Sequence, residues 1–284
     1  MTKATINGWE LDYTVTGDGP PLLFIHGGFG GVAGRLMPQP GMIAQAIGDG
    51  FSLIQYSRRN CGLSEMREAS YTQDDIADEA AALLTHLGHD KAIICGDSMG
   101  GTIAQSFALR HPEQINALAL IETSAHMSDA PFYQPLKGLM TVAALHGADA
   151  LFEKRRGAIY GPPAPNYDAF PAERREAMRA MADGLRVKLP EAPEELVRSC
   201  ALGELCNWRA HASYDTRPQL VEIGRFAPLV LHGDSDTTVP TPHGEDLARD
   251  IPGASLALIP GGNHGILAWP AARTALRSWL DSVS

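Results

Sequence analysis

The sequence has no long hydrophobic run and few cysteines. No stretch approaches about 18 consecutive apolar residues, and the N-terminus, MTKATINGWELDY, lacks the apolar core of a secretory signal. The four cysteines, Cys61, Cys95, Cys200 and Cys206, include no C-x-x-C pair, so we expect free buried thiols rather than a disulfide framework. These absences predict a cytoplasmic protein that does not bind a membrane.

An excess of basic charge is also absent. Aspartate and glutamate total 33 against 23 lysines and arginines, which gives a formal net charge of -10. Nucleic-acid-binding domains are normally basic, so we expect no nucleic-acid partner. The chain has no H-E-x-x-H motif and no paired Cys/His spacing, and we therefore expect neither a metal nor a cofactor.

The 284 residues suffice for one large core with an insertion. Short apolar runs predict strands at 22–26, 51–56, 91–95, 115–122, 227–233 and 255–261. Between and after them, helices are expected at 72–88, at 99–110 and from residue 270 onward. Buried strands that alternate with helices predict an α/β fold, with a mostly parallel sheet flanked by helices.

The alternation stops between residues 129 and 217. This segment is helical in pattern and rich in proline, and its clearest element is the amphipathic run 171–189. We therefore predict two domains. The core comprises 1–128 and 218–284, and the insertion 129–217 forms a helical cap over the strand ends.

The stretch GDSMGG, residues 96–101, follows one expected strand and opens an expected helix. In a nucleophile elbow the serine lies on a sharp, strained turn that lifts its hydroxyl above the sheet. Side chains two positions before and after it would collide, and here both positions are glycine, Gly96 and Gly100. We therefore predict that Ser98 is a nucleophile, next to helix N–H groups that favour an oxyanion.

Together with this elbow, two loop motifs resemble those of the α/β-hydrolase fold superfamily, in its capped, esterase-like branch. HGGFGG, residues 26–31, is similar to the family's oxyanion loop. SRRNCGLS, residues 57–64, resembles the family's D-x-R-G-x-G-x-S stretch and departs from it at Ser57 and Asn60. The resemblance covers nearly the whole chain outside the insertion, and it implies an α/β-hydrolase fold with an inserted helical cap.

The resemblance also implies a catalytic triad, in the chain order serine, acid, histidine. The family's pattern assigns the acid to Asp236 in LHGDSDTTVP and the base to His264 in GGNHGI. The base would take the serine proton, and the acid would orient the base. Asp234 in the same turn is an alternative acid. So is Glu122, because some relatives place their acid after the corresponding strand.

The same resemblance assigns the oxyanion hole to the backbone N–H groups of Gly28 and Met99. His26 and Arg59 are interpreted as anchors of their loops. The residues expected to line the substrate pocket are Phe29, Met127, Phe132, Met140, Met178 and Trp208. An alternative interpretation of these apolar residues is that they hold the cap helices together.

A serine at the elbow favours acyl transfer, whereas dehalogenases and epoxide hydrolases of this fold use a carboxylate nucleophile. We predict a serine esterase that cleaves small-molecule carboxylic esters through an acyl-enzyme on Ser98, with lactones and thioesters as further substrates.

Three alternatives stay open. Hydrolases that cleave C–C bonds of aromatic ring-fission products usually carry an aromatic residue where Gly265 follows His264. Proline-type aminopeptidases usually have Trp where Met99 stands, but acidic cap residues such as Glu204 keep this alternative open. The third alternative is a non-catalytic ligand receptor on the same fold.

Overall fold

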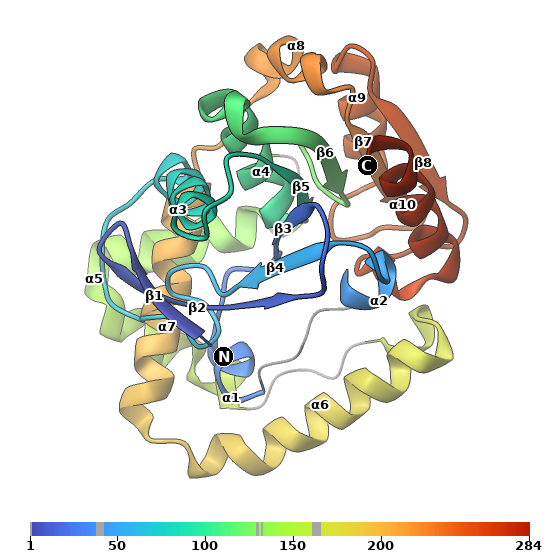
Figure 1. Cartoon of the computed structure of the whole chain (residues 1–284). Helices are drawn as coiled ribbons and strands as arrows, with labels where there is room; N and C mark the ends of the chain where they lie inside the picture. The colour runs from blue at the N-terminus through green and yellow to red at the C-terminus, as the bar shows by residue number, and fades with distance from the viewer. Residues whose placement is uncertain (1, 38–42, 129–130, 132, 161–165) are drawn as a thin grey trace.

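The computed structural model of the protein describes residues 2–37, 43–128, 131, 133–160 and 166–284. Within these residues, eight strands form one sheet in the order β1-β2-β4-β3-β5-β6-β7-β8 (Figure 1). The strands are β1 (Thr2–Ile6), β2 (Trp9–Thr16), β3 (Pro21–Ile25), β4 (Ser52–Tyr56), β5 (Ala92–Asp97), β6 (Ile115–Ile121), β7 (Leu229–Gly233) and β8 (Ser255–Ile259). Strand β2 is antiparallel to β1 and β4, and the other neighbours are parallel, which confirms the predicted fold class.

The central strands are buried on both faces. In β3, Leu23 and Ile25 join one apolar cluster, whereas Leu22 and Phe24 join a second cluster on the opposite side. One face is covered by α3 (Gln73–His86), α4 (Met99–Arg110), α8 (Leu220–Ile223) and α9 (Pro242–Asp250), and the other by α2 (Ile43–Ile47) and α10 (Pro270–Val283) (Figure 1). Burial on both faces is the physical reason why the central strands have nearly continuous apolar sequences, whereas the edge strand β8 is mostly exposed.

The N-terminal hairpin of β1 and β2 is absent from the predicted strands. Asn7 and Gly8 form its turn with φ values of 48° and 79°. Positive φ at both central residues is typical of a type I′ turn, and Asn-Gly is the dipeptide that favours it. The Asn-Gly turn signal for this hairpin was therefore present in the sequence, although the strands on either side of it lack a continuous apolar run.

Local signals place α3 as expected. Thr72 caps the helix by accepting a hydrogen bond from the Asp75 N–H, and the Asp75 carboxylate accepts one from the Thr72 N–H in return. The helix ends before Gly88, whose φ of 80° is the left-handed conformation that stops a helix. Short 3-10 helices are η1 (Pro112–Gln114), η2 (Tyr167–Ala169), η3 (Arg217–Gln219), η4 (Gly224–Phe226) and η5 (Ile266–Ala268).

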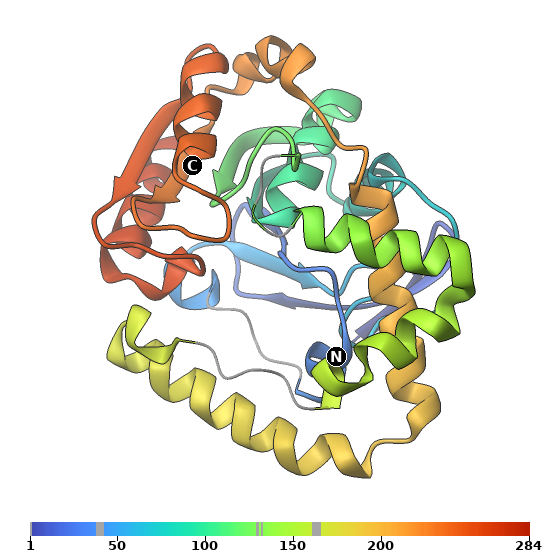
Figure 2. The same cartoon turned by 180° about the vertical axis from the view of Figure 1, so that it is seen from behind.

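The chain between β6 and β7 is helical, as predicted for the insertion. Its main helices are α5 (Tyr133–Tyr160), which breaks at Gly147, α6 (Ala172–Glu191) and α7 (Glu194–His211). Figure 2 shows α5 and α7 crossing beside each other, while α6 runs along the lower edge of the molecule. The short helix α1 (Val32–Leu36) packs between the core and the two helices α6 and α7. The domain boundaries at 128 and 218 stay a prediction.

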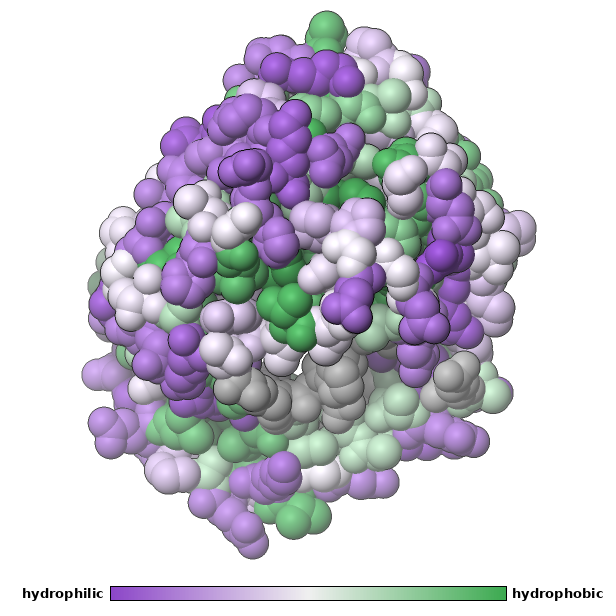
Figure 3. Space-filling model, in the orientation of Figure 1, coloured by the Kyte–Doolittle hydropathy of each residue, from purple (hydrophilic) through white to green (hydrophobic). Residues whose placement is uncertain are grey.

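The surface in the view of Figure 3 mixes hydrophilic and hydrophobic residues, including along the lower edge where α6 lies. Among the described residues, no helix combines the length and apolarity that a bilayer crossing requires. Cys61, Cys95, Cys200 and Cys206 are all buried and free, as expected.

Candidate active site

Ser98 lies in the sharp turn between β5 and α4. Its φ of 52° and ψ of −118° are outside the regions that L-residues normally adopt, which is the strain expected of an elbow. The turn is held by a hydrogen bond of 2.8 Å from the Ser98 N–H to the Ile121 carbonyl. A Cβ atom on Gly96 would lie 2.4 Å from the Gly100 carbonyl oxygen, and one on Gly100 would lie 1.9 Å from that of Ile25. No residue with a side chain therefore fits at either position.

His264 and Asp236 extend from the loops after β8 and β7 toward this serine. The His264 Nε2 atom is 3.1 Å from the Ser98 Oγ atom, and its Nδ1 atom is 2.8 Å from the Asp236 Oδ2 atom. The three side chains follow β5, β7 and β8 of the parallel part of the sheet, in which β6 separates β5 from β7. Because the carboxyl ends of parallel strands meet at one edge, residues 166 positions apart in the chain become hydrogen-bonding neighbours.

The contacts of Asp236 separate it from its neighbour Asp234. Asp236 is buried, and its Oδ1 atom accepts hydrogen bonds from the N–H groups of Thr238 (2.8 Å) and Val239 (2.9 Å). Asp234 is exposed, and its Oδ1 atom accepts from the Gly261 N–H at 2.7 Å. Asp236 therefore faces His264, while Asp234 ties together the loops that follow the two strands.

Glu122, the other alternative acid, lies on the Nε2 side of His264 and not on the Nδ1 side. Its carboxylate accepts hydrogen bonds from the N–H groups of Gly265 (2.8 Å) and Ile266 (2.7 Å), and its Oε1 atom is 3.8 Å from the His264 Nε2 atom. Burial raises the pKa of Glu122 to about 7. Burial, and then the charge of Glu122, hold the pKa of Asp97 well above its usual range. This carboxyl pair supports the backbone of the histidine loop.

The loop that carries Gly28 and the first turn of α4, which begins at Met99, both approach the serine. A Cβ atom on Gly27 would be only 2.9 Å from the Ser98 Cβ atom, so the loop after β3 runs against the elbow. Gly28 has a φ of 74°, a conformation that glycine adopts without strain. Met99 is the first residue of α4, and an N–H at this position has no acceptor within its own helix. The arrangement can present two backbone donors to an anion beside the serine.

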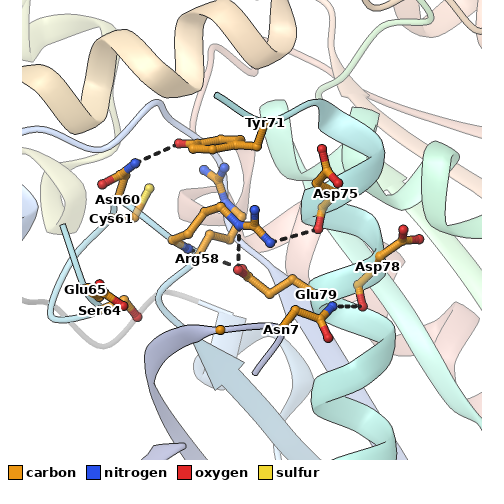
Figure 4. A network of polar contacts seen from close by, with 12 residues as sticks. Asn7, Arg58, Asn60, Cys61, Ser64, Glu65, Tyr71, Asp75, Asp78 and Glu79 are labelled. Carbon is orange, nitrogen blue, oxygen red and sulfur yellow. Dashed lines mark hydrogen bonds and ion pairs between the residues drawn. The ribbon is translucent and has the colours of Figure 1, made fainter. Parts of the chain in front are cut away.

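The loop anchors behave as interpreted from the sequence. The His26 Nδ1 atom is 2.7 Å from the Gly27 carbonyl oxygen, and its Nε2 atom accepts a hydrogen bond of 3.3 Å from the Arg58 N–H. Arg59 forms a buried ion pair with Glu79, with 2.7 Å between the Nε and Oε2 atoms. Figure 4 shows Glu79 extending from α3 toward the loop that carries Asn60 and Cys61.

Comparison with known proteins agrees with this fold. The family model described as alpha/beta hydrolase fold matches residues 20–151. A 3-oxoadipate enol-lactonase 2 of Acinetobacter baylyi is 27% identical over 74% of this chain and 71% of its own length. A 2-(acetamidomethylene)succinate hydrolase of Mesorhizobium japonicum is 26% identical over 92% of this chain and 87% of its own length. The structure of a thermophilic esterase from Thermogutta terrifontis has a TM-score of 0.68 at 25% identity and covers 99% of this chain and 98% of its own.

The chain has the α/β-hydrolase fold. The resemblance inferred from the elbow and the two loop motifs is thereby confirmed. The individual roles of Ser98, Asp236 and His264 stay predictions. In the structure, the three side chains lie within hydrogen-bond distance of one another in succession: Ser98 to His264, and His264 to Asp236.

The predicted pocket residues of this α/β hydrolase lie in two places. Phe29, Met127, Met140 and Trp208 pack into one apolar cluster between the core and helices α5 and α7, and Met178 is half-buried on α6. Phe132 lies outside the described residues. The clustering is what helix packing alone produces, so both interpretations given above stay open for these residues.

A cavity of about 590 Å³ opens beside the oxyanion loop of the α/β hydrolase. Its lining includes Gly27, Gly28 and Tyr56 from the core and Met181 from α6. Among the described residues, none of the predicted pocket residues lines this cavity. Met181, one helical turn after Met178, was part of the same amphipathic pattern and is the residue of α6 that reaches it.

Two residues near the site could not be identified from sequence motifs. Arg58 stands at a position where the family's loop motif specifies no residue type. Asn207, on α7, donates to the Phe29 carbonyl oxygen at 2.9 Å and accepts from the Tyr71 hydroxyl at 3.0 Å. No local pattern indicates these contacts, because their partners are distant in the sequence.

Glu122, Asp236 and His264 could also be considered as a metal site, since one ligand atom of each lies within 4.8 Å of the others. However, the Nδ1 and Oδ2 atoms are already joined by a hydrogen bond, and Glu122 accepts from two backbone N–H groups. The donor atoms of this group are therefore engaged with one another and with the loop.

Proposed function

We propose that this α/β hydrolase cleaves small-molecule carboxylic esters through an acyl-enzyme formed on Ser98. The observation that carries the proposal is the line of contacts from the Ser98 Oγ atom through both ring nitrogens of His264 to Asp236. A serine hydroxyl is a weak nucleophile at neutral pH, and a positioned imidazole removes its proton during attack. Asp236, in contact with Nδ1, orients the ring and stabilises the imidazolium that forms.

The reaction has two halves. In the first, the Ser98 Oγ atom attacks the ester carbonyl carbon while its proton passes to the His264 Nε2 atom. The carbonyl oxygen becomes an oxyanion beside the N–H groups of Gly28 and Met99, each typically worth about 3 kcal/mol. Collapse breaks the bond between the carbonyl carbon and the alkoxy oxygen, and the alcohol leaves with the proton from His264.

In the second half, water replaces the alcohol. His264 takes a proton from water as the water oxygen attacks the acyl carbon, and the new oxyanion occupies the same two donors. Collapse breaks the bond to the Ser98 Oγ atom, which regains its proton from His264. The products are one carboxylic acid and one alcohol for each water consumed.

Open-chain esters and lactones are both proposed as substrates, because an esterase and an enol-lactonase are among the similar proteins. A lactone is a cyclic ester and follows the same steps, except that the alcohol stays attached to the acyl group. We also propose that the insertion 129–217 acts as the cap of this site, with α6 and α7 contributing its inner surface.

The proposal is tested with purified wild-type protein, Ser98→Ala, Asp236→Asn and the matched control Asp234→Asn. Substrates are p-nitrophenyl esters of increasing acyl length, a lactone series, a prolyl amide and a vinylogous diketone. We expect ester or lactone turnover that falls at least about 10⁴-fold in Ser98→Ala and in Asp236→Asn, and little in Asp234→Asn. A fluorophosphonate should label Ser98 and no other residue.

Other outcomes have definite meanings. Turnover of the diketone alone would replace the ester proposal with C–C hydrolysis, and turnover of the prolyl amide alone would replace it with peptidase activity. Absence of label on Ser98 in folded protein would favour a ligand receptor. If Asp234→Asn lost activity and Asp236→Asn kept it, the assignment of the acid would be wrong.

A further inference from the structure

Arg58 is a fully buried arginine immediately behind the proposed oxyanion hole. It lies in the loop after β4, and its side chain is 0% exposed. One guanidinium nitrogen, Nη2, donates to the carbonyl oxygens of Gly27 (3.3 Å) and Gly28 (2.5 Å). The other, Nη1, lies 3.6 Å from the Met99 Sδ atom. A single side chain thus contacts both segments that carry the proposed oxyanion donors.

Arg58 forms no ion pair with any of the described residues. Within the described residues, no carboxylate lies within ion-pair distance of its guanidinium, and its Nε atom is buried without a hydrogen-bond partner. Glu79, the acid that extends toward this loop in Figure 4, is engaged by the side chain and backbone of Arg59. Burying an unpaired cation costs free energy, so this position is unfavourable for stability alone.

The two buried histidines near Arg58 do not add charge. Burial, and then the positive charge of Arg58, lower the pKa of His26 to about 3. The same two causes lower the pKa of His211 to about 3. Both rings are neutral at physiological pH, so the positive charge behind the loop belongs to Arg58.

The geometry of one peptide group links this charge to the reaction. The Gly27 carbonyl and the Gly28 N–H belong to the same planar, trans peptide unit, in which C=O and N–H point in opposite directions. His26 and Arg58 both contact the Gly27 carbonyl oxygen on one side. Fixing the oxygen on that side directs the N–H to the other, and hydrogen bonds to the oxygen strengthen the N–H as a donor.

We propose that Arg58 is a positioning residue of the acyl-transfer reaction, which aims and polarises the Gly28 N–H and offsets the negative charge of the oxyanion. This inference rests on the proposed function, since it requires an oxyanion at Gly28 and Met99. The unpaired cation acquires its counter-charge when the tetrahedral intermediate forms. Arg58 therefore favours the transition state over bound substrate.

The test compares Arg58→Met and Arg58→Lys with the matched control Arg35→Met. Arg35 also donates to backbone carbonyls of the loop after β4, those of Gly62 (3.2 Å) and Ser64 (3.3 Å), but it contacts neither Gly27 nor Gly28. Each variant is measured for kcat and KM on a p-nitrophenyl ester and for affinity toward a trifluoromethyl ketone, which forms a tetrahedral oxyanion adduct with serine. Thermal unfolding establishes the folded fraction.

We expect Arg58→Met to lower kcat by about 10²-fold, the loss typical of an impaired oxyanion donor, with KM changed less than about threefold. Affinity for the trifluoromethyl ketone should fall in parallel with kcat. Arg58→Lys keeps the positive charge but not the planar guanidinium group with its several N–H donors. Its losses of kcat and of ketone affinity should therefore be intermediate. Arg35→Met should keep kcat and ketone affinity within about twofold of wild type.

The inference is overturned if folded Arg58→Met or Arg58→Lys loses stability while kcat and ketone affinity stay at the wild-type level. If Arg58→Met does not fold, the lysine variant decides by the same comparison. A wild-type protein that neither hydrolyses esters nor binds the ketone contradicts the proposed function instead, so the two failures are distinguishable.

Discussion

Helices α6 and α7 belong to the same insertion, but they differ in the polar contacts that their described residues make with the core. On α7, Asn207 bonds to Phe29 and Tyr71, and His211 lies 3.2 Å from the Thr102 hydroxyl on α4. On α6, the Lys188 Nζ atom donates to the Leu36 carbonyl oxygen at 3.1 Å.

The two helices also differ in the burial of their side chains. Helix α7 buries residues along its whole length, from Val197 to His211. Among the described side chains of α6, Leu185 and Leu189 are buried, whereas Val187 is 66% exposed. Two amphipathic helices of similar length therefore differ in how far their described residues are buried.

The largest effect that sharpens this comparison is expected for Asn207→Ala. The substitution leaves the Phe29 carbonyl and the Tyr71 hydroxyl without this partner, inside the contact between α7 and the oxyanion loop. A buried polar group that loses its partner costs about 1–3 kcal/mol, and the Tyr71 hydroxyl still accepts a hydrogen bond from Asn60, so we expect a loss of about 2–3 kcal/mol in the free energy of unfolding. Urea denaturation measures it, and Lys188→Ala on α6 is the control, with an expected loss below about 0.5 kcal/mol. Equal losses would contradict the difference between the helices.

The next effect depends on pH. Burial, and then the charge of Arg58, lower the pKa of His211 on α7 from the ordinary histidine value of 6.5 to about 3, so its ring stays neutral in the folded protein over this range. Between these values the unfolded chain binds a proton that the folded protein does not bind, so stability is lost as the pH falls below 6.5.

At pH 5 this loss should be about 2 kcal/mol relative to neutral pH. His211→Gln removes the titrating group, and its unfolding free energy should fall less steeply over the same range in parallel denaturation curves. Helix α6 contains no histidine and cannot contribute such a dependence. An unchanged slope in the variant would show that His211 is protonated in the folded state.

Gly203→Ala on α7 tests how tightly that helix is packed. A Cβ atom there would lie 2.9 Å from the Asn60 Cβ atom, and Asn60 is fully buried, with hydrogen bonds to Arg67 and Tyr71. Overpacking of this kind costs about 1–3 kcal/mol, of which the better helix propensity of alanine recovers up to about 1 kcal/mol. We therefore expect a net destabilisation of about 1 kcal/mol in urea denaturation.

Gly184→Ala on α6 is the matched substitution and should have the smallest effect, of opposite sign. The nearest atoms to its Cβ would be Cε and Sδ of Met37, at 2.6 and 3.1 Å, and these form the flexible end of a side chain. Met37 can move, so the gain in helix propensity should dominate and stabilise the protein by up to about 1 kcal/mol. Destabilisation as large as that of Gly203→Ala would mean that α6 is as rigidly packed as α7.

Much of the proposed site was predictable from the sequence. The elbow around Ser98 depends on glycines at fixed spacing and on a strand followed by a helix, and such signals are local. The order of Ser98, Asp236 and His264 came from the resemblance, and the structure brings the three side chains within hydrogen-bond distance. Their catalytic roles remain for the experiments above to decide.

Other parts of the site were not predictable in this way. Asp234 and Asp236 lie in one turn, and only the family resemblance, not a local signal of the sequence, favoured Asp236 as the carboxylate that faces the imidazole. That choice depends on the directions of Thr238 and Val239, whose N–H groups hold Asp236. The sequence also predicted a pocket from apolar residues of the insertion, but apolarity does not distinguish a side chain that packs against helices from one that lines a cavity.

The sequence by itself determined the local features of this protein: where the buried strands run, where α3 begins and ends, and which serine occupies a strained turn. Each of these depends on residues within a few positions of one another, through backbone sterics, side-chain alternation and capping. Only the tertiary structure decided how the carboxylates of Asp236 and Glu122 are placed around His264, how far each helix of the insertion is buried, and where the charge of Arg58 lies. These depend on distances between residues far apart in the chain, which are set only when the strands and helices pack together.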